Sequence, residues 1–150
     1  MIRAVVALAA VTLGAGIVIA QEDAATARKA LMKENGKNMY TTGLSGMVKG
    51  VRPYDQAAAD AALAQLETSS KQISSLFPDT AKTSVPGGQY SASPKIWENK
   101  ADFDAKLAKY IAEIAVAKTK VKDLDSLKAE WPVLNSTCEG CHETYRIKNS

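Results

Sequence analysis

The sequence has few of the side chains from which metal and redox centres are usually built. It contains two cysteines and one histidine, and only 6% of its residues are aromatic. A structural zinc site normally takes four Cys or His ligands, so these three residues are too few for one. Runs of β-branched residues are also missing. We therefore expect no βαβ unit, which is the setting of a thioredoxin-like thiol pair.

The charge is nearly balanced, which excludes another group of functions. The chain has 19 Lys and Arg residues against 16 Asp and Glu, a formal net charge of +3. No basic tract or basic patch with interleaved aromatic residues is present, so we expect no nucleic-acid partner. The carboxylates are dispersed, and no group of side chains suggests acid–base catalysis. We therefore expect a protein that is not an enzyme.

Both cysteines and the single histidine, which could form a redox or metal site, lie near the end of the chain. Cys138-Glu139-Gly140-Cys141-His142 reads C-x-x-C-H, which is the attachment signature of a c-type haem. In such a site the two thiols form thioether bonds with the porphyrin vinyl groups, and the adjacent imidazole can bind the iron. The alternative is a purely structural helical module in which Cys138 and Cys141 form a disulfide.

The first twenty residues resemble an export signal. Arg3 is followed by an apolar run from Ala4 to Ala20 and then by polar residues. A positive residue, an apolar stretch and small residues at its end are typical of a secretory signal peptide. The alternative is a membrane anchor, but the run is shorter than the roughly 20 residues of a membrane span. We predict a signal peptide at 1–20, and an exported domain at 21–150 in the bacterial periplasm that keeps no stable membrane association.

Apolar residues recur at helical spacing through most of the exported part. We predict four helices, at about 22–49, at 55–76, at 93–120, and from a cap at Asp123 or Asp125 through Tyr145. The connection at 79–92 is expected to hold no regular element. This pattern predicts an all-α, antiparallel, up-down-up-down four-helix bundle with a cofactor site in its core.

The last helix carries the motif on a regular apolar seam. Its apolar positions follow one another at spacings of 4, 3, 4, 3 and 4, which places both cysteines on the face toward the core. These positions are Leu127, Trp131, Leu134, Cys138, Cys141 and Tyr145. Pro132 lies inside this helix and should kink or open it, since proline has no backbone N–H. The alternative is that the helix begins after Pro132.

Several stretches together resemble the class II cytochromes c, the cytochrome c′ family. The stretches that carry the resemblance are Arg28–Lys33, Val48–Gly50, Pro53–Asp55, Leu76–Pro78, Ile96–Trp97 and Cys138–Arg146. In this family the C-x-x-C-H motif lies near the C-terminus. The resemblance implies one haem c per chain, linked to Cys138 and Cys141, with His142 as the iron ligand.

Two branches of that family differ at the sixth iron position. The stretches 31–39 and 90–97 look more like the low-spin c-556 type, in which a methionine of the first helix is the sixth ligand. The resemblance therefore implies Met32 as that ligand, with Met39 and Met47 filling the core. One-electron transfer to redox partner proteins would follow. The alternative is a five-coordinate, high-spin cytochrome c′ that binds nitric oxide or carbon monoxide.

The resemblance also implies a contact between Arg28 and a haem propionate. Arg28 lies one helical turn before Met32, and the alternative is an arginine exposed to solvent. We expect Trp97, Trp131 and Tyr145 to be core residues rather than functional ones. Both a monomer and a homodimer are compatible with the pattern.

Overall fold

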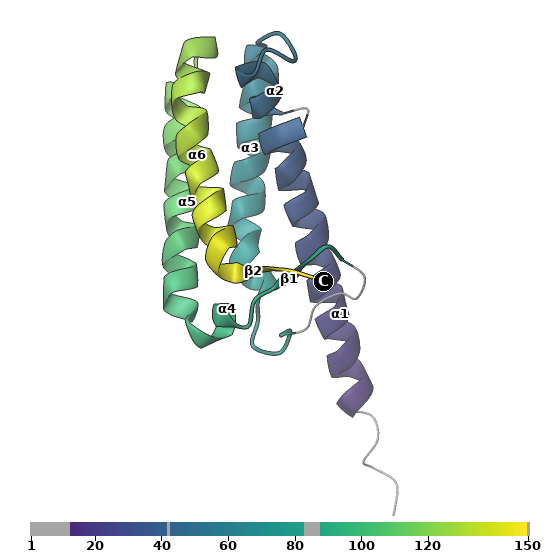
Figure 1. Ribbon diagram of the computed structural model, residues 1–150. Helices are drawn as coiled ribbons and strands as arrows, with labels where there is room; N and C mark the ends of the chain where they lie inside the picture. Colours follow the sequence, from purple (N-terminus) through teal and green to yellow (C-terminus); the bar gives the residue numbers. More distant parts are fainter. Residues whose placement is uncertain (1–12, 42, 83–87, 150) are drawn as a thin grey trace, which may run out of the picture.

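Four long helices stand side by side in the computed structural model, which describes residues 13–41, 43–82 and 88–149 (Figure 1). They are α1 (Leu13–Gly36), α3 (Gln56–Ile73), α5 (Lys100–Lys120) and α6 (Leu124–Tyr145). The colours in Figure 1 show that successive long helices run in opposite directions. The predicted all-α antiparallel four-helix bundle is therefore confirmed.

The first helix was predicted to be continuous over 22–49, but in the structure this segment is interrupted. Helix α1 ends at Gly36, a π-helical turn η1 follows at Lys37–Thr41, and a short helix α2 spans Leu44–Val48. The cause lies in part at Gly43, where an added Cβ would be 1.7 Å from the Asn38 carbonyl oxygen. Only glycine permits that close approach of two backbone segments. At its other end α1 begins at Leu13, so residues 13–20 of the predicted signal peptide are helical and residues 1–12 lie outside the described residues.

The second predicted helix agrees with the structure. The Asp55 side chain accepts a hydrogen bond from the Ala58 N–H at 2.9 Å and caps the first turn of α3. A 3₁₀ turn η2 (Ser74–Leu76) ends the helix just before Pro78. One face of α3 enters the core through Ala59, Ala62, Leu63, Leu66 and Ile73.

The third predicted helix is broken near its start. A short helix α4 (Lys95–Glu98) stops at Asn99, whose side chain accepts from the Asp102 N–H and begins α5. Asparagine is a strong N-cap because its side chain replaces the missing backbone acceptor. The Ser93 hydroxyl oxygen accepts from the Lys95 N–H at 3.3 Å, so the predicted start of this segment is close to the observed one.

A pair of short strands was not predicted. Strand β1 (Tyr90–Ala92) pairs antiparallel with β2 (Arg146–Lys148), with Ser91 opposite Ile147. The expectation of no regular element at 79–92 is therefore wrong for β1. Three residues are too few to show the alternation that indicates a strand, and the partner lies far away in the sequence. The pairing ties the end of α6 to the segment that precedes α4 (Figure 1).

The last helix is continuous through Pro132, so the alternative start after that proline is wrong. The helix begins with a capping box, in which Asp123 accepts from the Ser126 N–H and the Ser126 hydroxyl oxygen accepts from the Asp123 N–H. The apolar seam is confirmed. Leu127, Leu134 and Tyr145 are buried in the core, and Trp131, Cys138 and Cys141 are partly buried and pack against it.

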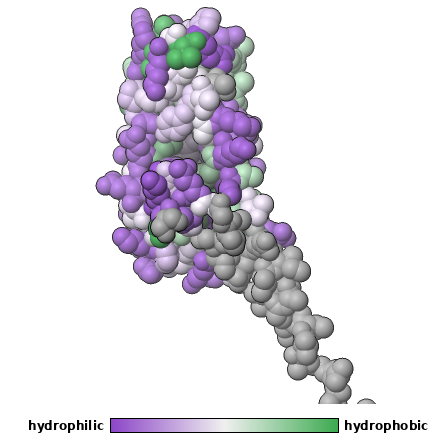
Figure 2. All heavy atoms as spheres, turned by 45° about the vertical axis from the view of Figure 1, so that its right-hand side comes forward, coloured by the Kyte–Doolittle hydropathy of each residue, from purple (hydrophilic) through white to green (hydrophobic). Residues whose placement is uncertain are grey.

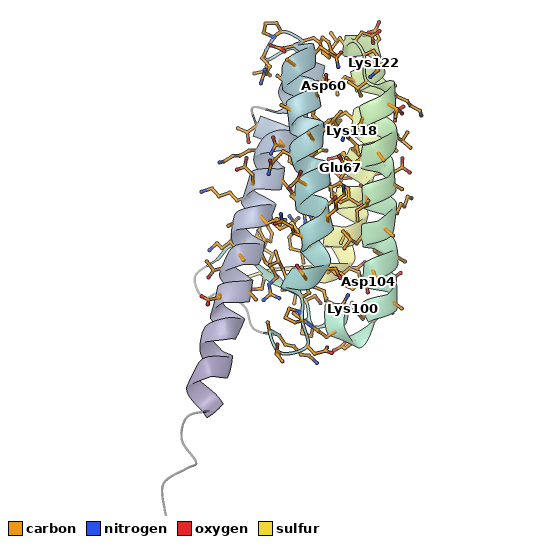
Figure 3. The ribbon with its side chains drawn as sticks, turned by 180° about the vertical axis from the view of Figure 1, so that it is seen from behind. Asp60, Glu67, Lys100, Asp104, Lys118 and Lys122 are labelled. Atoms are coloured by element: carbon orange, nitrogen blue, oxygen red, sulfur yellow. The ribbon has the colours of Figure 1, made fainter. Side chains whose placement is uncertain are left out.

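The outer surface is mostly polar, as Figure 2 shows for one face. Seen from behind, Glu67 of α3 lies beside Lys118 of α5, with which it forms an ion pair (Figure 3). Glu67 also pairs with Lys71 of its own helix. Exposed ion pairs of this kind contribute little to stability, so the buried faces of the helices hold the bundle together. No helix in the described ranges is both long and apolar enough to cross a membrane.

The capping box at Asp123 leads to a test by pH. Hydrogen bonds from Ser126 hold the pKa of the Asp123 carboxyl below its ordinary value. A lowered pKa in the folded state adds stability above the unfolded pKa, and this stability is lost as the pH falls through the folded pKa. We expect Asp123→Ala to lower the urea midpoint of unfolding at pH 7. In acid, where the Asp123 carboxyl is protonated in both proteins, the difference between their midpoints should be smaller. The matched control is Asp125→Ala, whose side chain is 95% exposed, and an equal loss from that control would contradict the assignment.

Candidate haem site

The two cysteines lie in the last turns of α6 as free thiols, and both are partly buried. Their spacing of three residues puts both sulfurs on the helix face that packs against the core. Burial raises the pKa of Cys138 to about 11, and the neighbouring Cys141 thiol adds to the rise. Burial also raises the pKa of Cys141. Both groups are therefore protonated thiols at neutral pH.

His142 follows on the same turn and is also partly buried. Burial, together with the positive charge of Arg146, lowers its pKa. At neutral pH the imidazole is therefore uncharged, which is the form that binds a metal ion. It lines an open cavity of about 430 Å³. The other residues around this cavity are Tyr90, Glu139, Glu143, Arg146 and Lys148.

The donor set in this part of α6 fits a covalently bound haem. Two reduced thiols face the core together, and a neutral imidazole follows directly. A Cβ added at Gly140, between the cysteines, would meet nothing within 4 Å, so the motif is not closed in by its neighbours. Cys138 and Cys141 could form the thioether bonds, and His142 could supply a nitrogen ligand.

The methionines of the described residues differ in accessibility. Met39 and Met47 are each 1% exposed and belong to the core. The Met47 sulfur also accepts a hydrogen bond from the Asp55 N–H at 3.4 Å. Met32, on α1, is only partly buried and packs against the edge of the core. Met32 is thus the methionine in the described ranges whose side chain is only partly buried.

Arg28 is buried, with 6% of its surface exposed, so the alternative of a solvent-exposed arginine is wrong. Its guanidinium donates to the Ala81 carbonyl oxygen at 3.0 Å and lies 4.8 Å from the centre of the Phe77 ring and 5.7 Å from that of Trp97. Burial lowers its pKa. These contacts attach α1 to the segment after α3, and the contact with a propionate stays a prediction.

The structure adds a contact between η1 and α6 that the sequence analysis missed. The Tyr40 hydroxyl donates to the Asn135 side-chain oxygen at 2.7 Å, and the Asn135 amide donates to Glu139 at 2.7 Å. The Trp131 indole N–H donates to the Met39 carbonyl oxygen at 3.2 Å. The Tyr40 ring also meets Trp131 edge-on, with 6.3 Å between centres. Trp131 and Met39 are 92 positions apart in the chain, and Tyr40 and Asn135 are 95 positions apart. No local sequence pattern could therefore reveal these bonds.

Trp97 and Tyr145 lie in an aromatic cluster, as expected of core residues. Phe77, Phe103 and Tyr145 stack edge to face, and Trp97 tilts against Phe77. The Tyr145 hydroxyl donates to an Asp102 carboxylate oxygen at 2.6 Å. Burial and this carboxylate raise the pKa of Tyr145 to about 12. Tyr145 therefore holds the end of α6 against α5.

A four-helix bundle that turns a C-x-x-C-H motif toward its core defines a c-type haem protein of the helical class. Comparison with known proteins places it more closely. The family model described as cytochrome C′ matches residues 23–146, and the chain belongs to this family. It is therefore a c-type cytochrome, an electron carrier of a family whose haem c is covalently bound and whose members are typically exported.

Individual relatives come from both branches of the family. Cytochrome c-556 of Rhodopseudomonas palustris is 43% identical over 149 residues, covering 99% of each chain. Cytochrome c′ of the same organism is 40% identical and covers 93% of this chain and 92% of its own. A solved structure of oxidised R. palustris cytochrome c556 superposes with a TM-score of 0.75 at 42% identity, covering 86% of this chain and 99% of the other.

The contact between η1 and α6 can be tested with a conservative substitution. Trp131→Phe keeps a ring beside Tyr40 but removes the donor to the Met39 carbonyl oxygen. We expect a loss of about 1 kcal/mol in the free energy of unfolding, together with an altered haem absorption spectrum, because η1 holds the end of α1. The control is Trp97→Phe, which removes a donor to the Pro78 carbonyl oxygen in another part of the bundle. Equal spectra for wild type and Trp131→Phe would contradict the prediction.

Proposed function

We propose that this protein is a periplasmic one-electron carrier whose haem iron is held by His142 and Met32. The observation that carries the proposal is the difference among the methionines: Met39 and Met47 are enclosed in the core, and Met32 is not. The 43% identity to a cytochrome c-556 supports the same branch.

Attachment is assigned to the two thiols of α6. Cys138 and Cys141 would each hold the haem through a thioether bond, formed by adding the thiol S–H across a vinyl group, which would require no oxidant. The bound group supplies one iron that changes its oxidation state by a single electron. His142 presents a neutral nitrogen from α6, and Met32 presents a soft thioether sulfur from α1. Two protein ligands held by separate helices limit the structural change on electron transfer.

Export is proposed from the N-terminal pattern. The family model begins at residue 23, which supports a mature domain that starts near Gln21. With Arg3 removed, 18 basic residues stand against 16 acidic ones, a net charge of +2. Such a domain suits redox partner proteins in the periplasm better than nucleic acid or a membrane surface. The domain would act as a monomer or as a homodimer.

The second candidate is a five-coordinate, high-spin cytochrome that binds nitric oxide or carbon monoxide. The 40% identity to a cytochrome c′ favours it. In this reading Met32 would pack at the open iron face without binding, and a diatomic ligand would take the sixth position. The two candidates share the haem attachment and differ only at Met32.

Met32→Ala separates the two candidates. If Met32 is the sixth ligand, the oxidised wild-type protein shows a low-spin absorption spectrum with the long-wavelength band of methionine–iron ligation. The variant should then become high-spin and bind carbon monoxide at least tenfold more tightly. Met39→Leu is the matched control, because it changes a buried methionine of the same segment and should keep the low-spin spectrum. A high-spin wild-type spectrum, or a low-spin Met32→Ala spectrum, would overturn the His142–Met32 assignment.

Covalent attachment has its own test. Coexpressed with a complete cytochrome maturation system, the wild-type chain should keep one haem after denaturation, seen as the added mass and as haem stain on a denaturing gel. The Cys138→Ala/Cys141→Ala double variant should lose all of it, because no thiol remains. A wild-type protein that emerges colourless would contradict the proposed function.

A further inference from the structure

Helix α1 lies beside α3, but it contributes little apolar surface to the core (Figure 1). Three of its described side chains are buried, and two of these are polar, Arg28 and Asn35. Leu31 and Met32 are only partly buried and pack against the edge of the core. An open cavity of about 340 Å³ lies along the seam between the two helices, with Leu31 and Ser69 in its wall. Apolar packing alone therefore does not fix the rotation of α1 about its own axis.

A buried hydrogen bond joins the two helices at this seam. The Ser69 hydroxyl of α3 donates to the Asn35 side-chain oxygen at 2.5 Å, and the two residues are 4% and 8% exposed. The Leu66 carbonyl oxygen lies 3.0 Å from the same hydroxyl. A hydroxyl carries one proton, so the shorter contact, to Asn35, is its principal bond. Losing this bond is costly, because the buried Asn35 oxygen would then lose its donor without gaining bulk water.

The bond lies next to the proposed sixth ligand. Asn35 follows Met32 by three positions, so both side chains lie on one face of α1. Arg28, four positions before Met32, lies on the same face, and its guanidinium donates to the Ala81 carbonyl oxygen. Met32 therefore stands between two buried polar side chains that bind segments outside α1. A rotation of α1 that carried the Met32 side chain sideways would have to break the bond between Asn35 and Ser69.

We propose that Asn35 is a positioning residue for the sixth iron ligand, and that its bond with Ser69 sets the rotation of α1 at which the Met32 sulfur meets the iron. This inference rests on the proposed ligation by His142 and Met32. Asn35 acts through Met32 and needs no contact of its own with the haem. Without the bond, α1 turns more freely and the Met32–iron bond is weaker. An external ligand then competes more successfully for the sixth position.

The test measures the affinity of the reduced holoprotein for carbon monoxide, which must displace Met32 to reach the iron. Ser69→Ala removes the donor and introduces a residue that favours helix. We expect the affinity to rise about fivefold, the factor that corresponds to one hydrogen bond of ordinary net strength. The matched control is Ser70→Ala, which removes the neighbouring buried hydroxyl. That hydroxyl donates to the Glu67 carbonyl oxygen at 2.8 Å, within α3, so the control should keep the wild-type affinity.

An affinity of Ser69→Ala equal to that of wild type, or an equal rise in Ser70→Ala, would overturn the proposal. Far-ultraviolet circular dichroism checks that each variant keeps its helices. Asn35→Ala is the second variant, and it should raise the affinity as Ser69→Ala does. The double variant Asn35→Ala/Ser69→Ala should add nothing further, since both substitutions remove the same bond. Additive effects of the two substitutions would show that they do not act through a shared bond, and would also overturn the proposal.

A second cycle shows whether the effect passes through Met32. In a Met32→Ala background no sixth ligand remains to be positioned, so Ser69→Ala should leave the affinity for carbon monoxide unchanged. A merely structural role of Ser69 would alter the haem pocket in both backgrounds. A rise of the same size with and without Met32 would therefore overturn the positioning role.

The spectrum of the oxidised wild-type protein separates failure of this inference from failure of the proposed function. A high-spin wild-type spectrum would overturn the ligation by Met32 and this inference together. A low-spin wild-type spectrum, combined with an unchanged affinity in Ser69→Ala, would overturn only the role assigned to Asn35 and Ser69.

Discussion

The packing of one face of α6 into the bundle core is the interaction on which the rest of this molecule depends. The seam that buries Leu127 and Leu134 also turns Cys138 and Cys141 inward. A helix that contributes apolar area to the core cannot rotate without exposing that area, so the burial that stabilises the bundle also orients the thiols. Stability and site geometry therefore have the same physical origin.

Helix α1 is held in place by contacts on both sides of Met32. Four residues before Met32, the Arg28 guanidinium is held by the Ala81 carbonyl oxygen and by aromatic rings. Beyond the end of α1, the π-turn η1 is attached to α6 through Tyr40 and Trp131. Met32 lies between these two attachments. The helix that carries the proposed sixth ligand is thus fixed relative to the helix that carries the motif, although the two are the first and last of the bundle.

On the proposed assignment, the two branches of the family share this framework. The free thiols and the neutral His142 imidazole would serve either branch. The proposal then makes the sulfur of Met32 the difference between an electron carrier with a filled iron site and a protein with an open one. A single side chain at the edge of the core can change the function while the fold stays the same.

The sequence by itself determined the helical class, the Asp55 cap, the inward seam and the identity of the haem-attachment motif, because these depend on spacings within one or two helical turns. Only the tertiary structure decided the break at Gly43, the β1–β2 pairing and the burial of Arg28. Each of these arises from contacts between segments distant in the chain. The physical reason is that a local pattern records which face of a helix is buried, whereas the atoms that meet that face are chosen by how the helices pack together.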